Sequence, residues 1–248
     1  MIKFFRQIRF KLMETGKTSK YLKYAIGEIL LVVIGILLAL SLNNWNESRK
    51  NELIKNRLIE DLVLELRSSK EKIDEVIITG NLHILNGNLF MKHIGSNVIE
   101  VPMDSLTKLG SFFTEGIPFD LNIPIYEEAK SSGRLSMIGN KQILVAYADI
   151  MSASVGESIH RTISTEMWYN GSGWELRKEI GNSAIFDSSH EMLPQKFRIS
   201  EKEFFDILSR LSTFATLKNA LQMKENRLKY MNRISKGMAK VIELLENE

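Results

Sequence analysis

The residues of this chain that could do metal chemistry are glutamates and histidines, and one pair has a suggestive spacing. Glu157 and His160 form a Glu-x-x-His element. A carboxylate-bridged di-iron bundle uses two such elements together with two further glutamates from facing helices. The chain contains one such element, so we do not expect Glu157 and His160 to bind iron.

A second candidate for metal binding begins at His190 and Glu191. It starts like the His-Glu-x-x-His signature of zinc proteases, but the second histidine is missing and Pro194 would break the helix that this motif requires. His83 and His93 are ten residues apart and would not meet on one helix face without a bend. We therefore expect no metal and no cofactor.

Nucleophile motifs are also incomplete. Ser69 with Lys72 and Ser105 with Lys108 match the Ser-x-x-Lys spacing of penicillin-recognising enzymes, but the companion motifs of these enzymes are missing. The sequence has no phosphate-binding loop, no Gly-x-Ser-x-Gly elbow and no cysteine. It therefore argues against an enzyme and predicts no catalytic residue.

Glu28 is an ionisable residue in an unusual place, because it lies within the longest apolar run of the chain. This run, from Tyr24 to Leu42, has nineteen residues. As a helix it would be roughly 28 Å long, close to the ~30 Å hydrocarbon core of a bilayer. The run predicts a transmembrane helix at 24–42.

The residues that flank this run predict its orientation. Seven basic residues and one acidic residue precede it, which predicts a basic cytoplasmic arm at 1–23 and a periplasmic domain at 43–248. A cleaved signal peptide is the alternative, since Ala39-Leu40-Ser41 resembles a cleavage site, but the long basic segment and long apolar run favour an uncleaved anchor. The side chains expected to anchor the helix in membrane lipid at headgroup level are Tyr21, Tyr24, Trp45, Lys20 and Lys23.

Two interpretations of Glu28 remain open. In the first, Glu28 lies near the cytoplasmic headgroups beside Lys20 or Lys23. In the second, it shares a helix face with Gly35 and Ala39, two small residues that would let another transmembrane helix approach closely while a protonated Glu28 forms a hydrogen bond across the contact. Glu28, Gly35 and Ala39 are therefore a candidate intramembrane partner face.

Composition indicates that the segment beyond the membrane folds and does not bind nucleic acid. Hydrophobic residues make up 44% of the chain, which is enough to build a core. The net charge is +3, but the chain after residue 23 has 26 basic and 29 acidic residues. This part lacks the basic surplus typical of a nucleic-acid-binding domain.

Apolar spacing predicts helices throughout this segment. One stripe begins in the helix that leaves the membrane and continues it as a stalk. Gly80-Asn81 and Asn86-Gly87-Asn88 are break signals, Gly95 is a clear stop, and we expect a kink rather than a hairpin. Asp104 can cap a short helix that ends near Phe113, and another short helix is expected at 125–132, closed by Gly133. The stripe consists of Leu53, Leu58, Leu62, Leu66, Ile73, Val76 and Ile77.

Two longer helices follow. Asn140 opens one that ends near Asn170, and a short helix at 174–180 comes after it. Ser200 and Glu203 form a capping box for a helix that runs nearly to the C-terminus and packs on the stalk. The apolar stripe expected in the first is Leu144, Ala148, Met151, Val155, Ile159 and Ile163, and in the second Phe204, Leu208, Leu211, Ala215, Leu221, Leu228, Met231, Met238, Val241 and Leu245. The predicted fold is all-α, an elongated helical bundle with a long C-terminal helix.

Three segments of the sequence are distinctive: the opening MIKFFR, the span YAIGEILLVVIGILLAL with the exit NNWNE, and the segment IYEEAKSSGRL at 125–135. Together they resemble an uncharacterised family of Gram-negative bacterial single-pass inner-membrane proteins. The resemblance implies an inner-membrane anchor and a periplasmic helical domain. It matches Glu28 to the intramembrane acid of the family and Trp45 to its exit aromatic, and it implies no reaction.

These observations lead to two hypotheses of different classes. The first is a non-enzymatic scaffold or accessory subunit of an envelope complex, with other inner-membrane or periplasmic proteins, or copies of itself, as partners. The second is a periplasmic ligand-binding sensor that signals through a partner. A pocket lined by aromatic side chains would favour the sensor, and the candidates are Tyr147, Trp168, Tyr169 and Trp174.

Overall fold

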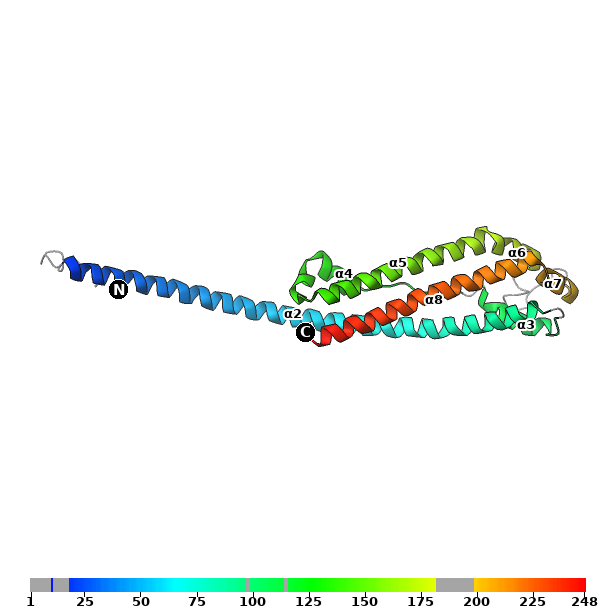
Figure 1. The fold of residues 1–248 in the computed structure, drawn as a ribbon, viewed down its shortest axis with the longest axis horizontal. Helices are drawn as coiled ribbons and strands as arrows, with labels where there is room; N and C mark the ends of the chain where they lie inside the picture. Colours follow the sequence, from blue (N-terminus) through cyan, green and yellow to red (C-terminus); the bar gives the residue numbers. More distant parts are fainter. Residues whose placement is uncertain (1–9, 11–17, 97–98, 114–115, 182–198) are drawn as a thin grey trace. The chain divides into compact units, whose positions relative to one another are not determined.

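The computed structural model describes residues 10, 18–96, 99–113, 116–181 and 199–248. These residues contain helices and no strand, so the predicted all-α class is confirmed. The chain divides into two compact units, residues 1–58 and 59–248. The helices are α2 (Thr18–Ile94), α3 (Met103–Gly110), α4 (Pro124–Ser131), α5 (Lys141–Asn170), α6 (Ser172–Ile180), α7 (Glu201–Leu208) and α8 (Leu211–Glu246), with short 3-10 helices at Ser111–Phe113 and Arg134–Ile138 (Figure 1).

The described part of the first unit is mainly the N-terminal portion of α2. Within the described residues, this helix alone is long and apolar enough to cross a membrane. None of its most apolar window is buried inside the protein. The predicted span is therefore a helix with apolar side chains on every side, which is the composition that a lipid-exposed helix needs.

Helix α2 continues through both predicted break signals and ends at Ile94, one residue before the predicted stop at Gly95. Gly80 stays helical because it has a packing role. A Cβ atom at Gly80 would lie 2.9 Å from a methyl carbon of Leu228 on α8, so the missing side chain lets the two helices approach closely. Expecting a break at Gly80 was wrong because helix packing outweighs the propensity cost of glycine, about 1 kcal/mol.

After α2 the chain reverses direction, so the expected kink is wrong. The hydroxyl of Ser69 donates to the carbonyl oxygen of Asn122 (3.4 Å), and the carboxylate of Glu65 accepts from the backbone N–H of Ile125 (2.6 Å). These contacts join residues more than fifty positions apart. The segment between α3 and α4 therefore returns along α2.

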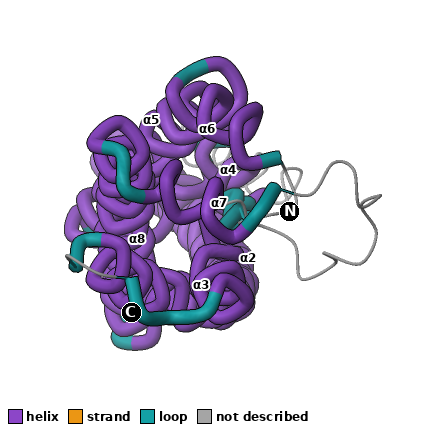
Figure 2. The backbone as a smooth tube through the Cα atoms, turned by 90° about the vertical axis from the view of Figure 1, so that its right-hand side faces the viewer, coloured by secondary structure: helices purple, strands orange, loops and turns teal. Residues whose placement is uncertain are grey.

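Helix α8 contacts both α2 and α5, which lie on either side of it in the view of Figure 1 and are seen end-on in Figure 2. It contacts α2 through Gly80 and α5 through two close approaches, because a Cβ at Gly237 would lie 2.7 Å from Ile150 and one at Gly156 would lie 2.3 Å from the Tyr230 ring. The buried residues of α8 follow a 3-4 spacing along the whole helix, which is the pattern of knobs-into-holes packing. They include Thr213, Leu217, Ala220, Lys224, Arg227, Met231, Ile234, Met238, Val241 and Leu245.

The predicted C-terminal helix is two helices, because the chain breaks at Ser209 and Arg210. The capping box of Ser200 and Glu203 at its start is confirmed. In one continuous helix, Leu211 would follow Leu208 on the buried face. The break instead leaves Leu211 83% exposed and lets α7 fold over the end of the bundle, where Phe204, Ile207 and Leu208 join a core cluster with Phe90, Phe113 and Trp168.

Helix α5 begins where predicted, since the side chain of Asn140 accepts from the backbone N–H of Gln142 (2.9 Å). Its expected core stripe is wrong. Val155, Ile159 and Ile163 are 60%, 54% and 45% exposed. The buried face is offset around the helix and includes polar Glu157, which hydropathy spacing does not identify as a core residue. It consists of Ile143, Tyr147, Ile150, Ala153, Glu157 and Trp168.

The shorter predicted helices are present with small differences. The helix expected at 125–132 is α4, and Gly133 after it has φ of 78°, the left-handed region that favours glycine. The helix expected to reach Phe113 is α3 followed by a 3-10 turn. Asp104 lies in the first turn of α3 and does not cap it, because Pro102 occupies the N-cap position.

Candidate functional site

The candidate intramembrane face lies on one unbroken helix. Glu28, Gly35 and Ala39 occupy positions i, i+7 and i+11 of α2, so they share one face as predicted. Apart from the backbone of its own helix, a Cβ atom at Gly35 would have no neighbour within 4 Å, so no other described segment covers this face at Gly35. Trp45 is 65% exposed. Whether Glu28 meets another helix stays a prediction.

The remaining predicted anchors, Lys20, Lys23, Tyr21 and Tyr24, lie in the same helix near its N-terminus. Among the described residues, no group of three or more histidine, cysteine or carboxylate side chains could hold a metal. His190, Glu191 and Pro194 lie outside the described residues.

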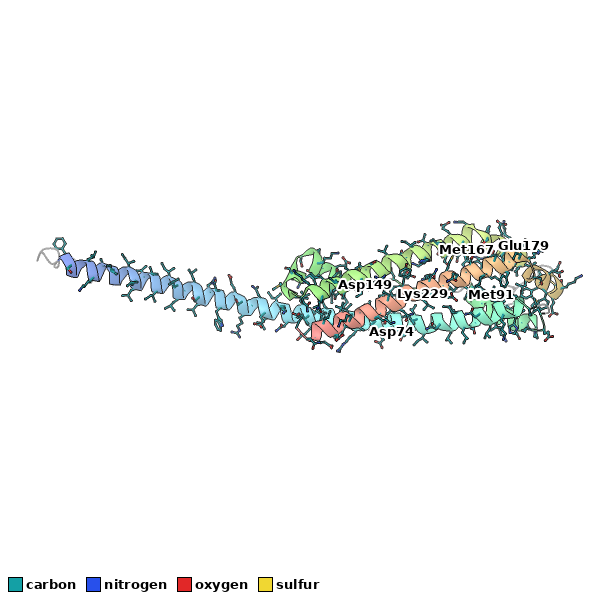
Figure 3. All side chains as sticks on the ribbon, in the orientation of Figure 1. Asp74, Met91, Asp149, Met167, Glu179 and Lys229 are labelled. Carbon is teal, nitrogen blue, oxygen red and sulfur yellow. The ribbon has the colours of Figure 1, made fainter. Side chains whose placement is uncertain are left out.

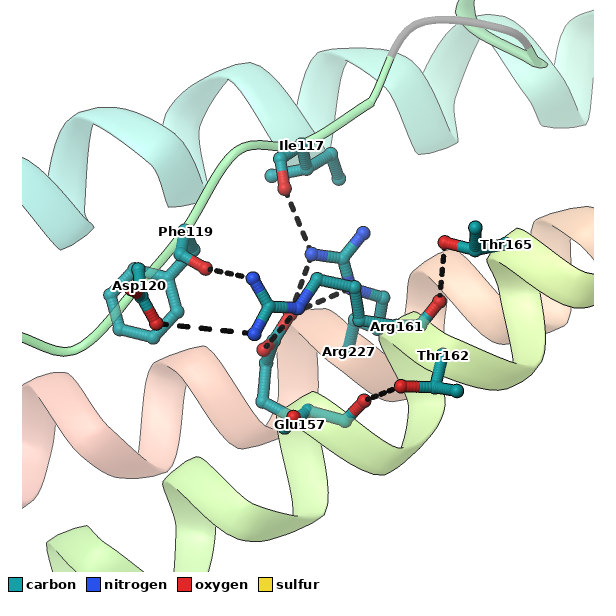
Figure 4. A network of polar contacts seen from close by, with 9 residues as sticks. Ile117, Phe119, Asp120, Glu157, Arg161, Thr162, Thr165 and Arg227 are labelled. Carbon is teal, nitrogen blue, oxygen red and sulfur yellow. Dashed lines mark hydrogen bonds and ion pairs between the residues drawn. The ribbon is translucent and has the colours of Figure 1, made fainter.

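Glu157 takes part in a buried ion-pair network. Its side chain is 2% exposed, and Nε of Arg227 on α8 donates to one of its carboxylate oxygens at 2.7 Å. Nε of Arg161, one turn along α5, lies 3.7 Å from the other oxygen. Two guanidinium groups therefore neutralise one carboxylate (Figure 4). His160 instead lies beside the ring of Tyr230, with ring centroids 5.5 Å apart.

The same network fixes the returning segment to the bundle. Arg227 donates to the carbonyl oxygen of Ile117 (2.8 Å), and Arg161 donates to that of Phe119 (3.0 Å). Three distant parts of the chain, namely the returning segment, α5 and α8, thus meet at Glu157 (Figure 4). Because its oxygens are held by arginines, Glu157 positions the helices and is not available as a metal ligand or general base.

A partly buried carboxylate, Glu65, caps α4 although it lies about sixty positions earlier in the chain. Glu65 on α2 accepts from the backbone N–H groups of Ile125 (2.6 Å) and Tyr126 (3.2 Å), which are unpaired donors in the first turn of α4. Burial raises the pKa of Glu65 above its ordinary value, although these two donors act in the opposite direction.

We expect a larger and a smaller loss of stability from two substitutions of this cap. Glu65→Ala leaves two N–H groups without an acceptor and should lower the free energy of unfolding by about 1–2 kcal/mol. Glu65→Gln keeps one acceptor oxygen and replaces the other with an amide NH2 group, which cannot accept from the second N–H, so it should lose less stability than Glu65→Ala at pH 7. Because the folded state holds the Glu65 proton more tightly, the wild type gains stability as the pH falls through the raised pKa, and the Gln variant does not. Urea unfolding at pH 7 and near pH 4.5 measures both differences, and an equal loss for both variants would exclude the capping role.

The aromatic side chains proposed for a sensor pocket do not line one cavity. Tyr147 is buried against Tyr126, with the rings stacked at a centroid distance of 4.1 Å. Trp168 and Tyr169 border a cavity of about 190 Å³. Trp174 is 43% exposed, and the guanidinium of Arg177 lies 5.7 Å from its ring centroid. The cavity beside Trp168 and Tyr169 is smaller than the ~300–1,000 Å³ of ordinary ligand pockets.

A groove of about 830 Å³ lies between α5 and α8. Its rim is basic, with five lysine or arginine side chains against one acid, Asp149. Asp149 is paired with Arg233, whose Nε donates to it at 3.1 Å, and this hydrogen bond holds the pKa of Asp149 below its usual value. The basic residues are Lys141, Lys229, Arg233, Lys236 and Lys240.

The groove is also apolar between its charged rims. Val145, Ala146, Gly237 and Leu244 contribute to its lining. Asp149 on α5 and Lys229 on α8 mark its two sides in Figure 3. Lys229 and Lys236 form no ion pair with another described residue, so the groove carries positive charge that the described part of the chain does not neutralise.

The outer face of α5 adjoins this groove through Val145. Between Gln142 and Thr165, a segment that is described throughout, the aspartate, glutamate, lysine and arginine residues are Asp149, Glu157 and Arg161, and each takes part in an ion pair. We call the groove and this outer face together the partner surface. The outer face consists of Leu144, Ala148, Val155, Ile159 and Ile163.

The sequence contains a pattern that predicts the basic side of this groove, although the net charge of the chain does not. Lys229, Arg233, Lys236 and Lys240 are spaced by four, three and four residues, which places them on one face of a helix. The chain after residue 23 has more acidic than basic residues, so its net charge does not reveal this local basic cluster. A count of charge along each helix face would have found it.

Comparison with known proteins adds one result. No curated protein and no solved structure matches the chain. A family model described as a family of unknown function (DUF6090) matches residues 28–92. The matched segment begins at Glu28 and ends near the end of α2, so the part of the chain that holds the candidate span resembles an uncharacterised family.

Proposed function

We propose that this protein is a single-pass inner-membrane protein whose periplasmic unit acts as a non-enzymatic scaffold or accessory subunit of an envelope complex. The partner surface of α5 and α8 is the observation that carries this proposal. It combines exposed apolar side chains with a basic groove, and contiguous exposed apolar patches are typical of protein–protein contact sites.

The membrane placement is supported by the apolar helix and by the charges beside it. Basic residues before the span favour a cytoplasmic N-terminus and a periplasmic unit. Within this role, the buried network at Glu157 gives α5 and α8 a fixed spacing. A fixed spacing suits a docking surface, because a preorganised surface loses less conformational entropy on binding.

Site-specific photo-crosslinking in native membranes tests the proposal. A photoreactive amino acid at Val145, in the full-length protein, should form one defined protein adduct. Lys229→Glu, Lys236→Glu and Lys240→Glu together should reduce its yield at least five-fold, because they reverse the charge of the groove. The matched control changes the same total charge elsewhere, through exposed Lys92, Lys108 and Lys202.

Two results would contradict the scaffold function. The first is an absence of any adduct at Val145. The second is equal adducts at Val145 and at Leu211, which is 83% exposed but outside the partner surface, because equal yields would indicate random collision.

A further inference from the structure

A second uncharged face lies on α2, on residues that the core does not use. Ile78, Leu82, Leu85 and Leu89 are 63%, 55%, 56% and 40% exposed. They are spaced by four, three and four residues, so they form one continuous stripe along the helix. We call this stripe the α2 seam. It is distinct from the partner surface, which lies on α5 and α8.

We propose that the α2 seam binds the α2 seam of a second copy of this chain, as a parallel two-stranded coiled coil. The parallel direction rests on the proposed membrane anchoring. Both copies would cross one membrane through the N-terminal part of the same helix, so α2 runs in the same direction in each.

The spacing of the α2 seam carries the first step of the argument. Two helices pack as a coiled coil when apolar residues alternate at intervals of three and four. The α2 seam has this pattern over twelve residues, and three of its four members are leucine. The face of α2 that packs into the core has the same seven-residue repeat, because the buried glycines Gly80 and Gly87 are seven residues apart. Helix α2 therefore has one stripe for α8 and a second stripe for another helix.

The charges beside the α2 seam favour a copy of the same chain. From Val76 to Met91 there is no aspartate, glutamate, lysine or arginine. The positions that flank a coiled-coil seam usually carry the charges that choose between partners. Here they hold neutral residues such as Thr79, Asn81 and Asn88. Two identical neutral faces meet without like-charge repulsion, whereas a seam built for a different chain would gain selectivity from charge.

The same neutrality argues against a lipid surface as the occupant. Helices that lie on membranes have lysine and arginine beside their apolar face, because these residues contact anionic headgroups. The α2 seam has none between Val76 and Met91.

The size of the α2 seam fits a pair that is held together by a membrane. From Ile78 to Leu89 the helix rises roughly 16 Å, which is a short contact for a dimer in solution. Two copies confined to one bilayer meet at a much higher effective concentration than free chains. A short apolar seam is then sufficient, and we expect pairing in membranes to exceed pairing of the same chain diluted in detergent.

Disulfide crosslinking tests both the contact and its direction. The chain has no cysteine, so each introduced cysteine is unique. In a parallel pair, Leu82 meets Leu82 and Leu85 meets Leu85. In native membranes, Leu82→Cys and Leu85→Cys should each form a disulfide-linked dimer of the full-length protein after mild oxidation. Leu211→Cys, at a position that is more exposed (83%) but outside the α2 seam, should form at least ten-fold less.

A charge variant supplies the second measurement. Leu82→Glu with Leu85→Glu places four acids in the paired seam, and it should lower dimer formation through Ile78→Cys at least ten-fold. Because both leucines are exposed, thermal unfolding should stay unchanged. The adduct from Val145 should also persist, so failure of the dimer and failure of the scaffold function give different results.

Three outcomes would overturn the dimer. Equal disulfide yields at Leu82, Leu85 and Leu211 would indicate collision. A disulfide that forms only when Leu82→Cys and Leu85→Cys chains are mixed would indicate an antiparallel pair. Full dimer formation in the charge variant would show that the α2 seam is not the contact.

Discussion

Glu157→Ala is expected to lower the free energy of unfolding by about 3–5 kcal/mol. The substitution leaves Arg227, whose side chain is 6% exposed, as a buried charge without its carboxylate. It also removes the carboxylate beside Arg161, which joins α5 to the returning segment. Urea unfolding of the full-length protein in detergent micelles, followed by tryptophan fluorescence, measures the change because Trp168 is buried at the end of the same helix.

Two further variants distinguish the effect of losing the ion pair from the effect of losing side-chain volume at Glu157. Glu157→Leu with Arg227→Leu removes both charges together, and this double variant should recover most of the loss, since a buried pair costs desolvation that apolar residues avoid. Arg161→Ala, at a side chain 39% exposed, should cost less than Glu157→Ala. A loss below about 1 kcal/mol for Glu157→Ala would show that the carboxylate is solvated and that the network does not fix the helices.

Gly156→Ala is expected to destabilise the bundle by about 1–3 kcal/mol, although alanine is the better helix former. The new Cβ atom would lie 2.3 Å from Cε1 of Tyr230, so α5 and α8 would have to separate or the ring would have to move. The same urea unfolding experiment measures the change. Ser152→Ala, on the exposed face of α5, is the control and should stay within about 0.5 kcal/mol of wild type.

A double-mutant cycle identifies the cause of this loss. In a Tyr230→Ala background the obstructing ring is absent, so Gly156→Ala should become neutral or stabilising by up to about 1 kcal/mol. If the loss at Gly156 were the same in both backgrounds, steric contact with Tyr230 would not be its cause.

Local sequence signals predicted the helices and most of their ends. Asn140 and Ser200 are N-caps because their side chains accept backbone N–H groups only a few residues away. Gly133 closes α4 because it adopts a left-handed conformation that other residues adopt only with strain. These interactions are complete within one helical turn, so the sequence alone determines them.

Which face of each helix is buried was less predictable. Val155, Ile159 and Ile163 have core spacing and core composition but lie at the surface, while Glu157 is buried. Hydropathy ranks each residue by its own transfer free energy, but Glu157 is stabilised by Arg227, seventy positions away in the chain. Apolar spacing identified a stripe on α5 but could not show whether the core or a partner covers it.

The sequence by itself determined that this chain is all-α, and that it has an apolar helix long enough for a bilayer and no complete catalytic motif. Periodicity, capping and helix length carry that information, because each depends on neighbours in the chain. Only the tertiary structure decided that the chain reverses after α2, that Glu65 caps α4, and that α5 and α8 enclose a basic groove. Each of these depends on contacts between distant residues, and their free energy arises only when the helices have packed.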